Sequence, residues 1–288
     1  MVYFKGKEIW KGLIMLKRTI AGIFITLITI AFFALRLVDV RLFNLFILGV
    51  AVISATEMVK AFQDGISKVD KVLIILYPCL IFPLATFLPQ IVVRISVLYL
   101  LFALIISVLL EPNKSIESLL KVMLGIFYPS APLLALVMLN YMGNLSWFVL
   151  ILAFTATSLT DVMAYLVGSA LKGKKLCPEI SPNKTVSGAV GGLLGGVIGS
   201  LATYYILKAL KVAVFTAGGF TTVFFLIMSG IMLSVTTQAG DLFESWLKRR
   251  LGIKDMGNLI PGHGGMLDRI DGLTFTAFTT FVLYSFLV

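Results

Sequence analysis

The sequence predicts an all-α, polytopic integral membrane protein with about nine transmembrane helices. Hydrophobic residues make up 59% of the 288-residue chain, charged residues only 13%, and the mean hydropathy is +1.03. Soluble domains usually carry about 45–50% apolar and about 25% charged residues. Because so few polar side chains cannot cover so much apolar surface, we expect lipid to be the solvent around most of the structure.

The apolar residues form long runs, and a helix needs about 20 such residues to cross the bilayer. The predicted spans cover residues 19–37, 42–59, 72–89, 92–110, 119–142, 146–168, 188–207, 212–237 and 272–288. A membrane barrel is not expected, because its strands would be shorter and would alternate in polarity. Pro78, Pro83, Pro129 and Pro132 lie inside predicted spans and are expected to kink them.

The basic residues predict how these spans are oriented. With the N-terminus in the cytosol, nineteen of the 24 Lys and Arg residues fall on the cytosolic side. The other side holds Arg36, Arg41, Arg94, Lys208 and Lys211. The positive-inside rule therefore favours nine spans, with a cytosolic N-terminus and an external C-terminus, in the inner or plasma membrane if the source is bacterial. Because the charge of +10 is spread over short loops, nucleic acid is not expected as a partner.

The seventh predicted span, residues 188–207, is rich in glycine. Two parallel rows of small residues run along it: Gly188, Gly192, Gly196 and Ser200, and Gly191, Gly195 and Gly199. Small residues four apart let neighbouring helices approach closely. The pattern predicts tight packing, which is compatible with packing inside one chain and equally with a homodimer.

The position of the polar residues divides the chain into two regions. Residues 1–150 hold five spans and are predicted to be a scaffold, whereas residues 151–288 hold four spans and two cytosolic active-site loops. Glu57, near the cytosolic end of its span, is expected to reach out toward water. Asp161 lies inside the sixth span, where a carboxylate is costly, so we expect a partner or a wet cavity and a functional role.

A basic segment after the sixth span is predicted to bind phosphate. Lys172, Lys174 and Lys175 precede Ser181-Pro-Asn-Lys-Thr185, which leads into the glycine-rich span. Lysines supply charge, hydroxyls supply donors, and a helix N-terminus supplies free N–H groups. The spacing is not that of a Walker A loop. Basic cytosolic loops also arise for topological reasons alone, so this segment by itself is weak support.

The largest group of charged residues lies in 238–272, and it contains the only histidine of the chain. Asp241, Glu244 and Lys248 are spaced to share one helical face, and Asp268 and Asp271 are spaced to share another. Oxygen ligands of this kind suit Mg²⁺, which often bridges carboxylates and substrate phosphates. We therefore expect a phosphorylated, water-soluble substrate to meet a lipid substrate near the cytosolic face.

These motifs resemble the signature of phosphatidate cytidylyltransferases, also called CDP-diacylglycerol synthases. The resemblance rests on Ser245-x-x-Lys248-Arg249, Lys254-Asp255, Pro261-x-His263-Gly264-Gly265 and Asp268-Arg269-x-Asp271, together with Asp161-x-x-Ala164-Tyr165-x-x-Gly168 and Ser181-Pro-x-Lys184-Thr185. The similarity covers about residues 155–275. Val186 departs from the pattern, in which an aromatic residue is expected.

The resemblance implies that CTP and phosphatidic acid react in the membrane to give CDP-diacylglycerol and pyrophosphate. It also implies Mg²⁺ as a cofactor, and a second bound cation is compatible with it. The implied catalytic residues are Asp241, Lys248, His263, Asp268 and Asp271, with Asp241, Asp268 and Asp271 as metal ligands. The implied substrate-binding residues are Asp161, Ser181, Lys184, Thr185, Arg249, Lys254, Asp255, Gly264, Gly265 and Arg269.

Two other functions remain compatible with the composition. One is a transferase or kinase that uses CTP and acts on another lipid, such as a polyprenol. The other is a secondary transporter, for which Asp161 would lie on the substrate path. Transporter sites usually lie near the membrane midplane, whereas these residues are predicted to lie near one face.

Overall fold

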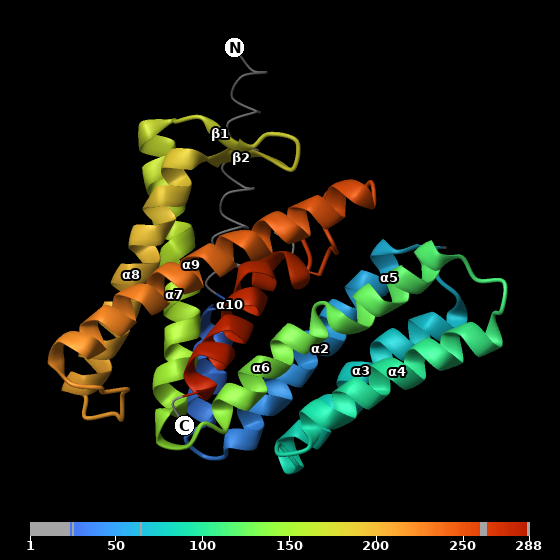
Figure 1. The fold of residues 1–288 in the computed structure, drawn as a ribbon, viewed down its shortest axis with the longest axis horizontal. Helices are drawn as coiled ribbons and strands as arrows, with labels where there is room; N and C mark the ends of the chain where they lie inside the picture. Colours follow the sequence, from blue (N-terminus) through green and yellow to red (C-terminus); the bar gives the residue numbers. More distant parts are fainter. Residues whose placement is uncertain (1–23, 25, 64, 260–263, 287–288) are drawn as a thin grey trace, which may run out of the picture.

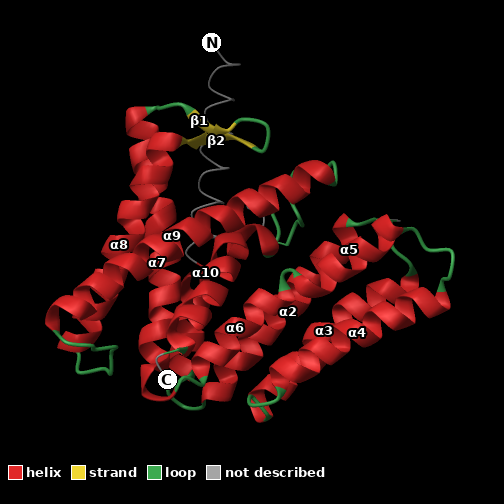
Figure 2. Cartoon of the chain, in the orientation of Figure 1, coloured by secondary structure: helices red, strands yellow, loops and turns green. Residues whose placement is uncertain are grey.

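The computed structural model describes residues 24, 26–63, 65–259 and 264–286, and most of these residues are helical (Figure 2). The long helices are α2 (Val40–Ala61), α3 (Lys68–Phe87), α4 (Val92–Leu110), α5 (Ile116–Phe127), α6 (Ser130–Asn140), α7 (Ser146–Leu171), α8 (Val186–Ala209), α9 (Gly219–Arg250) and α10 (Leu267–Ser285). A short 3₁₀ turn, η1 (Gly143–Leu145), precedes α7, and two strands, β1 (Lys175–Cys177) and β2 (Ser181–Thr185), follow it. The all-α class is therefore confirmed.

Seven helical segments are long and apolar enough to cross a membrane, which confirms a polytopic membrane protein. Neither α10 nor the short apolar helix Thr26–Leu35 is among these seven. The first five residues of α10 include Asp268, Arg269 and Asp271. Part of the predicted span 19–37 lies outside the described residues. The predicted count of nine spans is thus not confirmed.

The prolines affect their helices unequally. Predicted span 119–142 is interrupted at Tyr128, whose backbone is extended, so that it forms α5 and α6 instead of one helix. Pro129 follows this break, where a missing N–H costs nothing, and Pro132 lies in the first turn of α6, where N–H groups have no helical partner. Pro78 and Pro83 lie inside α3, which continues past both.

Helix α10 lies between two groups of helices. It packs against α7 and α9 on one side and against α6 on the other (Figure 1). Helices α7 and α8 run side by side with α9 across them, and the strands lie at the end of this group. Residues from the last four helices can therefore meet at one end of the bundle.

The glycine rows of α8 pack inside this chain. A Cβ at Gly195 would collide with the carbonyl of Leu159 in α7, and one at Gly196 would collide with the carbonyl of Gly230 in α9. Gly191 leaves similar space for Val167. The predicted close approach is confirmed, and its partners in this structure are α7 and α9.

Two helix ends differ from their predicted positions, and both differences affect the site. Helix α9 continues to Arg250, thirteen residues beyond the predicted end of its span, so residues 238–250 between the last two predicted spans are helical. Helix α10 begins at Leu267, five residues earlier than predicted. A charged helix can extend beyond the lipid because water solvates its side chains there. Asp241 and Lys248 are consequently held on α9, and Asp268 and Asp271 on the first two turns of α10.

Candidate active site

The basic segment that was expected to be a loop forms a β-hairpin. Strands β1 and β2 pair antiparallel, with Lys175 opposite Thr185 and Cys177 opposite Ser181. This segment lies between two apolar helices, and it satisfies its own backbone groups by pairing. The hydroxyl of Thr185 accepts a hydrogen bond from Gly188 N–H at 3.1 Å and so caps α8. The hairpin is therefore joined directly to the start of α8.

A cavity of about 660 Å³ lies between the hairpin, α7, the start of α8 and α9. Its lining includes Asp161, Tyr165, Lys172, Lys175, Asn183, Lys184, Thr185, Gly188, Gln238 and Asp241. Lysines, an amide and a helix N-terminus are the groups that bind phosphate oxygens. The predicted phosphate-binding segment thus does form one wall of a polar cavity.

Lys184 connects the hairpin to α9 across this cavity. Its Nζ donates to Asp241 Oδ2 at 2.8 Å, and both side chains remain partly accessible. Asp161 of α7 lines the same cavity and lies within electrostatic range of both. Asp161 is exposed and lines a polar cavity, as expected for a carboxylate inside a predicted span.

A second cluster lies where α9 meets the start of α10. Lys248 Nζ donates to Asp268 Oδ1 at 2.7 Å and lies 3.5 Å from Glu244 Oε1. Asp268 Oδ2 accepts hydrogen bonds from Met256 N–H at 2.9 Å and Gly265 N–H at 2.8 Å. Both carboxylate oxygens of Asp268 are therefore occupied, one by a cation and one by backbone.

Negative charge exceeds positive charge among these neighbouring groups. Glu244 is completely buried, and neither of its oxygens has a hydrogen-bond partner among the described residues. Asp271 lies within electrostatic range of Asp241 and Glu244. Of the five carboxylates Asp161, Asp241, Glu244, Asp268 and Asp271, three form ion pairs with a lysine: Asp241 with Lys184, and Glu244 and Asp268 with Lys248. Carboxylates gathered in this way repel one another unless a cation or a proton joins them.

These donors have the chemistry for a hard divalent cation, which prefers oxygen ligands. In the described part of the chain, however, no three His, Cys, Asp or Glu side chains converge on one point. Asp241 is paired with Lys184 and Asp268 with Lys248. Metal ligation by Asp241, Asp268 and Asp271 therefore stays a prediction.

An apolar cavity of about 270 Å³ lies on the other side of Asp161. Its walls are mainly Ile28, Phe46, Ile47, Val50, Leu133, Leu136, Phe154, Ile270 and Leu273. Asp161 and Arg269 also line it, so it combines an apolar wall with charged groups. Asp161 lines both cavities, the polar one and the apolar one.

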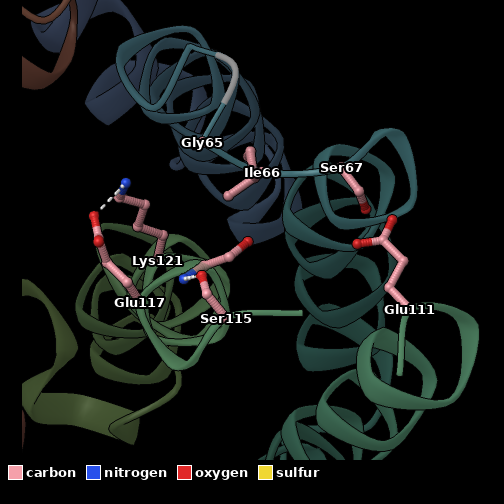
Figure 3. Close-up of a pocket in the computed structure, with 8 residues that line it drawn as sticks. Gly65, Ile66, Ser67, Glu111, Ser115, Glu117 and Lys121 are labelled. Atoms are coloured by element: carbon pink, nitrogen blue, oxygen red, sulfur yellow. Dashed lines mark hydrogen bonds and ion pairs between the residues drawn. The ribbon is translucent and has the colours of Figure 1, made fainter. Parts of the chain in front are cut away.

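A third depression, of about 450 Å³, lies beside the start of α3 and the start of α5. Figure 3 shows its lining, which includes Glu111, Glu117 and Lys121, the last two joined by an ion pair of 2.8 Å. None of the predicted site residues lines it. The candidate active site is therefore assigned to the other two cavities.

Several predicted residues lie apart from the two cavities. Ser181 lies on β2 but does not line the polar cavity. Arg249 is exposed, and its Nε lies 3.5 Å from the carbonyl of Ile180 in the hairpin turn. Lys254 and Asp255 are exposed in the segment after α9. Pro261 and His263 lie outside the described residues.

The predicted glycines make room for carboxylates. Gly264 has a φ of +85°, a conformation that favours glycine, and a Cβ there would lie 2.7 Å from Asp268 Oδ2. A Cβ at Gly265 would lie 2.6 Å from both oxygens of Glu57. Substrate binding by Gly264 and Gly265 stays a prediction.

Two acidic residues, Glu244 and Glu57, lie against predicted site residues although they were not predicted to be part of the site. Glu244 was recognised only by its spacing from Asp241 and Lys248, which placed it on the same face of α9. Glu57 was expected to reach toward water, and this is wrong: it is 4% exposed and binds the start of α10. The sequence signal for Glu57 was its position inside an apolar run, and this position did not indicate that its partner is the start of α10.

Comparison with known proteins agrees with the signature residues. A profile of the cytidylyltransferase family matches residues 16–287, and so extends through the first spans as well as the predicted region 155–275. A phosphatidate cytidylyltransferase of Brucella abortus is 40% identical over 153 residues, which cover 53% of each chain. The Bacillus subtilis enzyme of that name is 44% identical over 116 residues, 40% of this chain and 39% of that protein.

A third relative, the phosphatidate cytidylyltransferase of Rickettsia bellii, is 32% identical over 161 residues, covering 56% of this chain and 68% of that protein. The alignment spans about half the length of the Brucella relatives. The family match nevertheless includes nearly all of the present chain. The predicted resemblance is confirmed, and the chain belongs to the cytidylyltransferase family.

Proposed function

We propose that this protein transfers the cytidylyl group of CTP to phosphatidic acid, giving CDP-diacylglycerol and pyrophosphate, with divalent-metal assistance at the cytosolic face of the membrane. The observation that carries the proposal is the meeting of a polar cavity and an apolar cavity at Asp161. The polar cavity, with its lysines and helix N-terminus, suits a nucleoside triphosphate. The apolar cavity, with Arg269, suits the phosphate end of a lipid. The family match supports both assignments.

In this mechanism an oxygen of the lipid phosphate attacks the α-phosphorus of CTP. A new P–O bond forms, the bond between the α-phosphorus and the β-bridging oxygen breaks, and pyrophosphate leaves. The lipid phosphate is ionised near neutral pH, so no general base is required. Lys184 and the start of α8 hold the triphosphate, and Arg269 orients the lipid phosphate. Most of the catalysis therefore comes from positioning and charge neutralisation.

A bound divalent cation would supply additional positive charge to the phosphate oxygens as pyrophosphate departs. Asp241 and Asp271 are the residues that would hold it, because they lie near each other and near the buried Glu244. Asp241 would exchange its bond to Lys184 for the cation, which frees that lysine for the triphosphate. Asp268 binds Lys248 and the backbone N–H of Met256.

The proposal is tested with the purified protein, CTP, phosphatidate and Mg²⁺ in detergent. We expect pyrophosphate and CDP-diacylglycerol to appear in equal amounts, and only when phosphatidate is present. A lipid kinase that uses CTP would release CDP in place of pyrophosphate, and a transporter would release neither. Release of CDP with a polyprenol acceptor would overturn the proposal.

The cytosolic location of the site is tested by labelling native Cys177, which lies on β1. In a Cys79→Ala variant, Cys177 is the only cysteine. We expect an impermeant maleimide to label it in inside-out vesicles and not in intact cells. The control is a chain without native cysteines in which Ala217, between α8 and α9, is replaced by cysteine. We expect the maleimide to label this cysteine in intact cells and not in inside-out vesicles. Labelling of Cys177 from outside would contradict the predicted orientation.

The role of Asp161 is tested by Asp161→Asn, which keeps the size of the side chain and removes its charge. Because Asp161 lies between the cavities, we expect kcat/KM to fall on the order of 100-fold for both substrates, the scale of one charge-assisted contact. Asp39→Asn is the matched control, since Asp39 is an exposed N-cap of α2 and asparagine caps equally well. Wild-type kinetics in Asp161→Asn would reduce Asp161 to a structural residue.

A further inference from the structure

Glu57 lies on α2, in the region that was predicted to be only a scaffold, yet its carboxylate contacts the catalytic end of the chain. Oε1 accepts a hydrogen bond from Met266 N–H and Oε2 accepts one from Leu267 N–H, both at 2.9 Å. These N–H groups are at the start of α10, where no helical carbonyl is available to them. A carboxylate at a helix N-terminus is also favoured by the helix dipole.

The backbone encloses this carboxylate closely. A Cβ at Gly265 would lie 2.6 Å from both oxygens, and a Cβ at Gly257 would also collide with Oε1. Glu57 is 4% exposed, so water does not compete for its oxygens to any large extent. The space beside the two glycines is occupied by the Glu57 carboxylate.

Glu57 and Asp268 act on adjacent backbone groups. Asp268 accepts from Gly265 N–H, and Glu57 accepts from the next two N–H groups along the chain. Asp268 also binds Met256 N–H, next to Gly257. The two carboxylates together therefore hold the segment after α9 against the first turn of α10.

We infer that Glu57 is a positioning residue for the reaction. It sets where α10 begins and thereby the direction of Asp268 toward Lys248, although it lines neither of the two site cavities. The N-terminal helices would then contribute one side chain that orders the catalytic groups. The kinetic part of this inference rests on the proposed function, whereas its structural part does not.

The first test is hydrogen–deuterium exchange on the substrate-free protein with Glu57→Gln. Glutamine keeps the volume but places an NH₂ group against one of the two backbone donors, so one hydrogen bond is lost. We expect faster exchange in a peptide covering residues 264–270 and unchanged exchange in the hairpin, residues 175–185. Glu117→Gln, at an exposed glutamate on α5, is the matched control. Unchanged exchange at 264–270 would overturn the inference.

The second test is kinetic. We expect Glu57→Gln to lower kcat about 10- to 100-fold, the scale of hydrogen bonds to a charged group, and to change the KM for CTP by less than about threefold. The KM should change little because no residue of α2 or of 264–268 lines the polar cavity. An effect on KM alone would contradict a positioning role. If the wild type transfers no cytidylyl group, the proposed function is wrong. The contact between Glu57 and the start of α10 is then still supported if Glu57→Gln increases hydrogen–deuterium exchange at 264–270.

A double-mutant cycle separates this contact from direct substrate binding by Gly265. Gly265→Ala inserts a methyl group against the Glu57 oxygens and should lower kcat by itself. In a Glu57→Ala chain those oxygens are gone, so adding Gly265→Ala should have a smaller effect. Fully additive effects would contradict the inference. Gly265→Ala also serves as the exchange test if Glu57→Gln does not fold.

Discussion

Asp241→Asn and Asp271→Asn are each expected to lower turnover by at least about 1,000-fold, the upper range for removing one group that stabilises transition-state charge. Each change keeps the side-chain volume and removes one carboxylate from the neighbouring set of Asp241, Glu244 and Asp271. Each change removes a charge that repels its neighbours, and the partly exposed Lys184–Asp241 pair contributes little, so neither change should harm folding. We therefore expect normal yields and normal thermal midpoints, measured in detergent alongside the rate of pyrophosphate release.

A metal titration accompanies these two variants. Chelator should abolish activity in the wild type, and added Mg²⁺ should restore it. In the variants, higher Mg²⁺ should recover part of the rate if the lost carboxylate bound the cation. Asp39→Asn should behave as the wild type throughout. Activity within tenfold of the wild type in both variants, or full activity in chelator, would remove the metal from the mechanism.

Lys248→Met is expected to affect mainly stability, and Lys184→Met mainly the binding of CTP. Lys248 is 16% exposed and lies between Asp268 and Glu244, whose side chains are 4% and 0% exposed. Its loss would leave two buried carboxylates without their cation, at a cost on the order of 3 kcal/mol in the free energy of unfolding. We expect a clearly lower thermal midpoint and no measurable turnover.

Lys184 and Asp241 form an ion pair that is more exposed to solvent than the Lys248 pairs, with side chains 28% and 21% exposed. Solvent weakens such pairs, so Lys184→Met should cost less than about 1 kcal/mol. Because Lys184 faces the polar cavity, the KM for CTP should rise by about tenfold, and more than kcat falls. Equal losses of stability in the two variants would contradict this distinction.

A double variant identifies the cause of the Lys248 effect. Lys248→Met with Asp268→Asn removes both charges of the buried pair, while the asparagine oxygen can still accept from backbone N–H groups. We expect the thermal midpoint to recover in part and activity to remain absent. A midpoint that does not recover would mean that packing of the lysine side chain, and not its charge, stabilises this end of α9.

Sequence reasoning located most of the helices because the signal for a membrane span is local. Each of α2, α3, α4, α7 and α8 lies within a few residues of its predicted range. The signal fails where a helix leaves the lipid. The apolar run ends near Thr237, but α9 continues for thirteen more residues, since a helix can also form from charged and polar residues. The hairpin was missed for a related reason: its strands are three and five residues long, too short for a clear alternating pattern.

Residue types and spacing by themselves determined that the protein is a polytopic helical membrane protein and that it resembles cytidylyltransferases. They predicted that the site residues lie in the last 130 residues. They also placed Asp241 and Lys248 on one helical face, because helical periodicity depends only on neighbours along the chain. Only the tertiary structure decided which carboxylate pairs with which lysine, that Asp161 lies between two cavities, and that Glu57 binds the start of α10. Contacts between residues about 210 positions apart depend on how whole helices pack, and no local pattern in the sequence encodes that arrangement.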